Sequence, residues 1–117
     1  MEVCSLGERL VKVIIAGRLD TQGVDRVETR LVAALVPGAN NAIVDLSQVD
    51  FVASMGIRML VSVARSLRTR QAALALYGAP ERVTQVFDAV SLGKIIPICS
   101  TETEALAAVS APRPTGA

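Results

Sequence analysis

The stretch DFVASMGIRMLVSVARSL, Asp50 to Leu67, holds the transition from a strand to a helix. Phe51-Val52 is typical of the end of a strand, and the apolar residues from Ile57 onward follow steps of three and four, which is typical of an amphipathic helix. Just upstream, the run Asn41–Leu46 predicts a buried strand, and Ser47–Asp50 predicts a polar turn. A buried strand that leads into an amphipathic helix predicts an α/β fold.

The alternation of strands and helices extends toward the amino terminus. Leu10–Ala16 is rich in β-branched residues and predicts a strand, with Val3–Leu6 as its hairpin partner. Apolar residues at helical spacing then predict a helix over Thr21–Val36. Asp20 or Thr21 can cap this helix, because its side-chain oxygen can accept a hydrogen bond from a free backbone N–H.

The alternation also extends toward the carboxyl terminus. The pattern predicts a strand at Ala73–Tyr77, a helix at about Glu81–Ala89 and a last strand at Lys94–Ile98. Thr101 and Glu104 have the spacing of a capping box, which predicts a final helix. For the helix that begins near Glu81, we expect the following residues to point inward: Val83, Val86, Phe87 and Val90.

This order of elements predicts one α/β domain. It implies a mixed, mostly parallel sheet of four to five strands with about four helices, since alternating strands and helices form parallel sheets with crossover connections. We assign residues 1–110 to this domain and expect the Pro-containing segment 111–117 to be a frayed tail.

Composition argues against several functional classes. The chain has no histidine, which is the most frequent general base and metal ligand, so we expect no metal, no cofactor and no enzymatic activity. The net charge of +1 does not favour nucleic acid as a partner. Cys4 and Cys99 form no C-x-x-C pair, which is consistent with reduced thiols. Without a signal peptide or an apolar stretch of about 20 residues, we expect a cytoplasmic protein with no membrane span.

Ser54 stands at the junction between the strand and the helix, and three interpretations of it are open. It can cap the helix that starts near Met55. It can be phosphorylated, and Gly56 beside it would then let another protein's backbone approach closely. It can be a nucleophile, although the only two lysines, Lys12 and Lys94, are distant in sequence.

The helix that follows Ser54 is basic. Between Phe51 and Pro80 the chain has no Asp or Glu, but it has four arginines: Arg58, Arg65, Arg68 and Arg70. These side chains form either a solvated face or a surface for an acidic partner, with Met55 and Met59 as adaptable apolar contacts. Nucleic acid is a weaker interpretation, because no aromatic residues alternate with these arginines.

Four short motifs occur in order along the chain: Gly17–Asp20 (GRLD), Ala42–Ser47 (AIVDLS), Phe51–Gly56 (FVASMG), and Val83–Phe87 (VTQVF) followed by Leu92 and Ile95-Ile96. Together they resemble the anti-sigma factor antagonists, which are single STAS domains of bacterial partner-switching systems. The resemblance covers nearly the whole chain and implies the STAS fold, with no enzymatic activity of its own.

The resemblance also implies a mechanism. It assigns Ser54 as the residue that a serine kinase, itself the anti-sigma factor, phosphorylates. The unphosphorylated antagonist binds this kinase and frees the sigma factor, the phosphorylated form does not bind, and a phosphatase resets the system. Nothing in the sequence indicates an oligomeric state. The partner-binding surface would comprise Asp20, Ala53, Ser54, Met55, Gly56, Arg58 and Met59.

The sequence departs from the family pattern at two positions. Ala53 stands where the family usually has aspartate, and Met55 replaces the second hydroxyl residue of its motif. These departures suit an alternative function, a non-phosphorylated STAS subunit or scaffold, for example of a lipid-transport ABC complex. A small nucleotide-binding or hydrolytic enzyme is disfavoured, because the chain has neither a G-x-x-x-x-G-K-[ST] nor a G-x-G-x-x-G motif.

Overall fold

The computed structural model describes residues 1–110, which contain a five-stranded sheet and four α-helices. The elements follow one another as β1 (Glu2–Gly7), β2 (Leu10–Leu19), α1 (Thr21–Leu35), β3 (Asn41–Val52), α2 (Ser54–Thr69), β4 (Leu74–Tyr77), α3 (Glu81–Ala89), a 3-10 turn (Leu92–Lys94), β5 (Ile98–Cys99) and α4 (Glu102–Ser110). The tail expected at 111–117 lies outside the described residues, and the single-domain assignment of 1–110 stays a prediction.

The sheet is mixed and mostly parallel, which confirms the predicted fold class. The strands lie in the order β1-β2-β3-β4-β5. β1 pairs antiparallel with β2, and the remaining neighbours pair in parallel. Each parallel connection uses a helix as its crossover, as the alternation of elements required.

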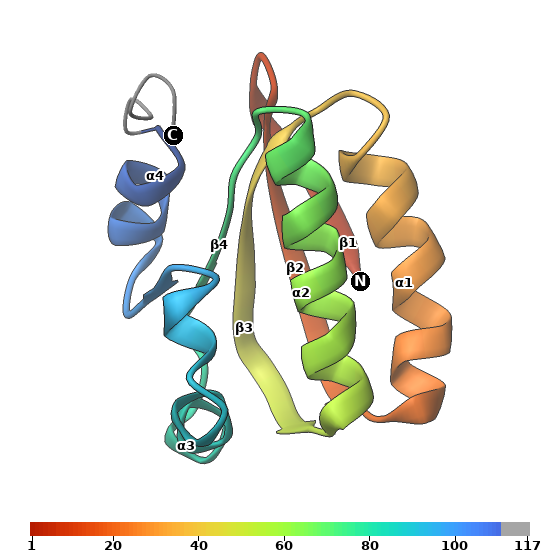
Figure 1. Ribbon diagram of the computed structural model, residues 1–117, viewed down its shortest axis with the longest axis vertical. Helices are drawn as coiled ribbons and strands as arrows, with labels where there is room; N and C mark the ends of the chain where they lie inside the picture. Colours follow the sequence, from red (N-terminus) through yellow and green to blue (C-terminus); the bar gives the residue numbers. More distant parts are fainter. Residues whose placement is uncertain (111–117) are drawn as a thin grey trace.

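Helices cover both faces of the sheet. Figure 1 shows α1 and α2 side by side, and α4 across β4 from them. Successive residues of β3 explain this arrangement, since Val44 belongs to the larger apolar cluster with α1, α2 and α3, whereas Ile43 belongs to a smaller cluster with Ala105 and Val109 of α4. Successive side chains of β3 point to opposite faces of the sheet, so one buried strand contributes to the apolar clusters on both faces.

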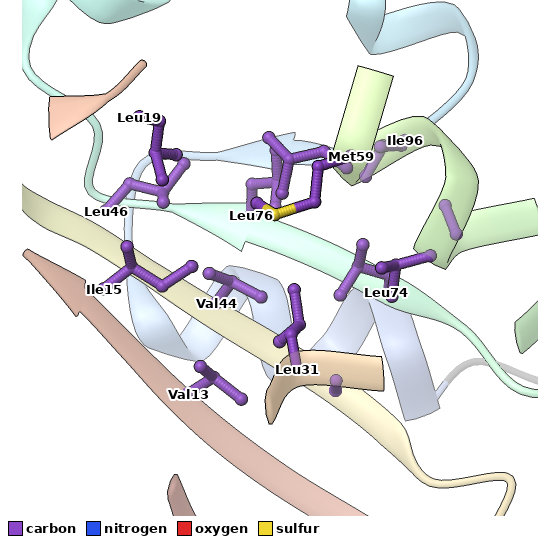
Figure 2. Packing of buried hydrophobic residues seen from close by; sticks show 14 of the residues in the cluster. Val13, Ile15, Leu19, Leu31, Val44, Leu46, Met59, Leu74, Leu76 and Ile96 are labelled. Atoms are coloured by element: carbon purple, nitrogen blue, oxygen red, sulfur yellow. The ribbon is translucent and has the colours of Figure 1, made fainter. Parts of the chain in front are cut away.

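The larger core is built from aliphatic side chains. In Figure 2, Leu31 of α1 and Met59 of α2 lie over strand residues that include Val13 and Val44. Leu31 is fully buried and Met59 is 1% exposed. Burial of such side chains stabilises the fold by about 1.5–3 kcal/mol each, so this packing fixes how α2 and its amino terminus sit on the sheet.

β3 is longer than the sequence indicated. The segment Ser47–Asp50 was expected to be a polar turn, but it continues the strand as far as Val52. Its partner is the second half of β2, where Ala16 pairs with Gln48 and Gly17 with Val49 after a shift in register. Hydrogen bonds of the ladder depend on the backbone, so a long neighbouring strand holds polar residues in extended conformation.

Two expectations about the carboxyl-terminal part are wrong. Most of Lys94–Ile98 is not a strand: Lys94 ends the 3-10 turn, and the strand β5 begins only at Ile98 and spans Ile98–Cys99. The reason is that Leu92 and Ile96, both 1% exposed, are four residues apart, so a helical turn points both inward. On α3, Val83 and Phe87 are buried as expected, but Val90 is 52% exposed and Val86 is only half-buried.

Candidate functional site

The residues that follow β2 and β3 lie side by side at the carboxyl edge of the sheet. Leu19 pairs in register with Val52. The N–H of Ala53 also donates a hydrogen bond to the carbonyl oxygen of Leu19 at 2.9 Å. Asp20 and Ala53 are therefore neighbours, and α1 and α2 both begin at this edge (Figure 1). The edge brings together residues that the sequence placed in separate motifs.

Asp20, one of the two residues that the sequence offered as a cap, is the N-cap of α1. Its Oδ1 accepts a hydrogen bond from the N–H of Gly23 at 3.0 Å. This bond and the Arg18 guanidinium hold the pKa of Asp20 below its ordinary value. Arg18 pairs with Oδ2 of Asp20 at 3.3 Å and lies over the ring of Phe51, 4.3 Å from its centroid. The edge thus carries a fixed carboxylate beside a cation–π pair.

Ser54 is the first residue of α2 and not its cap. Ala53 occupies the N-cap position, with extended backbone (φ −95°, ψ 173°) and no side-chain bond to the helix. Ser54 is exposed, and its hydroxyl makes no hydrogen bond within the part of the chain that the structure describes. The interpretation of Ser54 as a helix cap is therefore wrong by one position, and its hydroxyl is available to solvent.

Gly56 and Met59 do not belong to the exposed surface expected from the sequence. A Cβ at Gly56 would lie 2.9 Å from the carbonyl oxygen of Leu19 and 3.1 Å from Cγ1 of Val52, so this glycine allows α2 to approach the sheet. Met59 lies three residues later on the same inward face and is 1% exposed. Both positions serve packing, because α2 turns this face toward β2 and β3.

Three of the predicted residues, Ala53, Ser54 and Arg58, line a groove. A cavity of about 550 Å³ between α2 and α3 is lined by Val52, Ala53, Ser54, Ile57, Arg58, Val61, Val86 and Val90. Apolar side chains form most of its lining, and only Ser54 and Arg58 contribute polar side chains. Both are exposed, and Met55, next to Ser54, is 39% exposed.

Sequence reasoning missed three residues at this site. Phe51 is 40% exposed beside Arg18. Val86 of α3, which is half-buried, and Val90, the C-cap of α3, line the groove. Strict alternation along β3 could not have revealed Phe51, because Val49 and Val52 are both buried and the two residues between them are exposed. No sequence signal distinguished the valines of α3 from core residues.

Within the described residues, no basic side chain forms a hydrogen bond with Ser54 that would activate it as a nucleophile. Lys12 pairs with Glu102 of α4, and Lys94 lies in the 3-10 turn. Within 1–110, no group of three or more Cys, Asp or Glu side chains could hold a metal ion. Nor does any helix in this range have the length and apolar character needed to cross a membrane.

The STAS domain family model matches residues 7–105. This chain belongs to the STAS domain family, among the anti-sigma factor antagonists. The anti-sigma-B factor antagonist of Listeria monocytogenes is 30% identical to this STAS domain over 94 residues, which are 80% of this chain and 82% of that protein. Members of the family are regulatory binding proteins, so this STAS domain is grouped with regulators and not with enzymes.

Solved structures of anti-sigma factor antagonists share the fold of this STAS domain. The anti-sigma factor antagonist SpoIIAA in its unphosphorylated form superposes with a TM-score of 0.78 at 22% identity, covering 97% of this chain and 98% of that chain. The phosphorylated form of the Bacillus cell fate determinant SpoIIAA gives a TM-score of 0.70 at 22% identity, covering 92% of this chain and 97% of that chain.

Proposed function

We propose that this STAS domain binds an anti-sigma factor serine kinase while it is unphosphorylated, and that phosphorylation of Ser54 ends the binding. The observation that carries the proposal is the exposed, unbonded hydroxyl of Ser54 at the start of α2. Family membership supports it, and so does the existence of SpoIIAA in phosphorylated and unphosphorylated forms. The protein would act in the cytoplasm and release the sigma factor by occupying the kinase.

The proposed binding surface is the carboxyl edge of the sheet and the groove beside it. It comprises the exposed or half-buried residues Asp20, Ala53, Ser54, Met55 and Arg58. Met55 offers an adaptable apolar contact, and the groove offers further apolar area that a kinase segment would bury. Gly56 and Met59 support this surface from below, so we do not expect them to touch the kinase.

The phosphoryl transfer would use ATP bound to the kinase. Oγ of Ser54 attacks the γ-phosphorus, the new Oγ–P bond forms, and the bond from the γ-phosphorus to the β–γ bridging oxygen breaks, which releases ADP. The hydroxyl proton passes to a base on the kinase, because among residues 1–110 no side chain accepts a hydrogen bond from Ser54. A phosphatase would reverse the modification by attack of water, releasing inorganic phosphate.

Phosphate at Ser54 would weaken the interface for an electrostatic reason. A phosphoserine carries a charge of about −1.5 to −2 at pH 7. It would stand at the edge that already holds the carboxylate of Asp20, and that charge would lose its water in the complex. Moving a phosphate group with this charge out of water is costly, so the complex would dissociate.

The test is a pull-down from lysate of the native host with three baits: wild type, Ser54→Ala and Ser54→Asp. We expect wild type and Ser54→Ala to retain a kinase with an ATP-binding domain, and Ser54→Asp to lose it. Adding Mg-ATP should release the kinase from wild type alone. Intact mass spectrometry should then find one phosphate on wild type and none on Ser54→Ala.

The second candidate function is a non-phosphorylated subunit or scaffold, for example of a lipid-transport ABC complex. It is favoured by Ala53 at the N-cap of α2 and by Met55 in place of a second hydroxyl residue. Retention of one transporter ATPase by all three baits, with no phosphate on any bait and no response to Mg-ATP, would establish this second function and refute the first.

A further inference from the structure

Arg58 lies one helical turn after Ser54 on α2. Residues four apart on a helix are neighbours on its surface, with about 5–6 Å between their Cβ atoms. Both side chains also line the same groove, and both are exposed. A group attached to Oγ of Ser54 would therefore stand within reach of the Arg58 guanidinium.

Arg58 has no anionic partner of its own. Its guanidinium forms no hydrogen bond or ion pair with any of residues 1–110, and the sequence contains no Asp or Glu between Phe51 and Pro80. Other arginines of the molecule are engaged, since Arg68 donates to the carbonyl oxygen of Ile95 at 3.1 Å and Arg18 pairs with Asp20. The groove thus presents an unpaired cation beside a free hydroxyl.

We propose that Arg58 is the intramolecular ligand of a phosphate ester carried by Ser54. The guanidinium fork matches the oxygens of a phosphate and can donate two parallel hydrogen bonds to it. This inference rests on the proposed function, because it needs Ser54 in its phosphorylated form. It deepens that function by naming the group of this chain that receives the phosphate.

The pairing would make Arg58 change roles with phosphorylation. In the unphosphorylated protein the guanidinium is free at the rim of the groove, where it can meet a carboxylate of the kinase. In the phosphorylated protein it turns to the phosphate and is withdrawn from that surface. Phosphorylation would thereby add an anion to the interface and remove a cation from it in one step.

The test uses protein with phosphoserine incorporated at position 54 during translation, so no kinase is needed. A ³¹P NMR titration measures the second pKa of the phosphate, which is ordinarily about 6. We expect this pKa to be higher in Arg58→Ala than in the Arg58-containing protein by about 0.2 to 0.7. This difference corresponds to the interaction free energy of an exposed ion pair. Arg58→Lys, which keeps the charge but not the fork, should give an intermediate value.

Arg65→Ala is the matched control, because Arg65 is an exposed arginine two turns further along α2. It removes the same charge and should leave the phosphate pKa at the value of the Arg58-containing protein. Equal shifts in Arg58→Ala and Arg65→Ala, or no shift in either, would overturn the proposal. Since the phosphate is installed without the kinase, this result is independent of whether the pull-down supports the proposed function.

Discussion

The backbone N–H of Ala53 donates a hydrogen bond to the carbonyl oxygen of Leu19 at 2.9 Å, which ties the start of α2 to the end of β2. Gly56 packs on the same leucine, because its missing side chain leaves room for the Leu19 backbone. Through these contacts Ser54 is held at the edge where Asp20 begins α1. The geometry of the candidate site therefore depends on close backbone packing.

The first prediction concerns Gly56→Ala. Its Cβ would lie 2.9 Å from the carbonyl oxygen of Leu19 and 3.0 Å from the Leu19 Cβ, so α2 would have to shift. Overpacking should cost about 1–3 kcal/mol, against a gain of about 1 kcal/mol that alanine brings to a helix over glycine. Because the blocking atom is a backbone oxygen, we expect the cost near the upper end and a net fall of about 1–2 kcal/mol in the free energy of unfolding. Urea denaturation followed by circular dichroism measures the difference.

Gly7→Ala is the control for this substitution. A Cβ at Gly7 meets no atom within 4 Å, so its effect on the free energy of unfolding should stay within about 0.5 kcal/mol. If Gly56→Ala were as stable as wild type, the close approach of α2 to Leu19 would not be a constraint on the fold.

The second prediction concerns Ala53→Asp. The N-cap position of α2 has extended backbone but no side-chain acceptor, so a carboxylate there should accept a bond from the first turn. We expect the free energy of unfolding to rise by about 1 kcal/mol. Ala53→Asn supplies an acceptor without the charge and separates the hydrogen bond from the charge effect. A loss of stability in both variants would contradict the assignment of Ala53 as the N-cap.

The third prediction is a pH dependence at Asp20. Its pKa is lowered by the bond from Gly23 and by Arg18, so its stabilising effect is present above the unfolded-state pKa of about 3.9 and is lost as pH falls through the folded-state pKa. Asp20→Asn should be less stable than wild type at pH 7, and this difference in stability should become smaller below about pH 4. Thermal unfolding of both proteins across pH 3–7 measures the difference in stability. A difference that does not change with pH would contradict the prediction.

The fourth prediction uses the single tyrosine of the chain, which has no tryptophan. Tyr77 donates a hydrogen bond to Oε1 of Glu102 at 3.0 Å, and burial together with this bond raises the pKa of Tyr77 to about 12. The folded-state pKa lies above the unfolded value of about 10. The stabilisation that the protonated Tyr77 hydroxyl gives to the folded state is therefore fully present below pH 10 and is lost as pH rises toward 12.

The phenolate absorbance of the native protein should therefore titrate near pH 12, and that of the urea-unfolded protein near pH 10. Circular dichroism at each pH must show that the fold persists. Glu102→Gln should lower the native midpoint, because the carboxylate helps to keep the phenol protonated. A native midpoint near 10 would contradict the burial of the Tyr77 hydroxyl against α4.

Local signals in the sequence predicted much of this fold. Asp20 caps α1 as expected, and the capping box of α4 is confirmed, since the N–H of Glu104 donates to Oγ1 of Thr101 at 3.2 Å. These features depend on neighbours in sequence, and for that reason the residue pattern revealed them. The position of Ser54 at the start of a helix likewise followed from the junction of a strand and an amphipathic helix.

Other features needed long-range contacts. The extension of β3 through Ser47–Asp50 follows from pairing with β2, and no local pattern encodes it. The burial of Met59 and the groove between α2 and α3 likewise follow from how helices pack against the sheet. The local sequence around a methionine on a helix does not show whether that face of the helix is exposed to solvent or packs against a strand.

By itself, the sequence determined the order of strands and helices and the position of Ser54 beside a helix start, because periodicity and capping act over a few residues. Its four ordered motifs also carried the STAS resemblance. Only the tertiary structure decided that Ala53 and not Ser54 is the cap, and that Gly56 supports packing while Arg58 shares a groove with Ser54. The physical reason is that these properties depend on the register of β2 with β3 and on how closely α2 approaches Leu19.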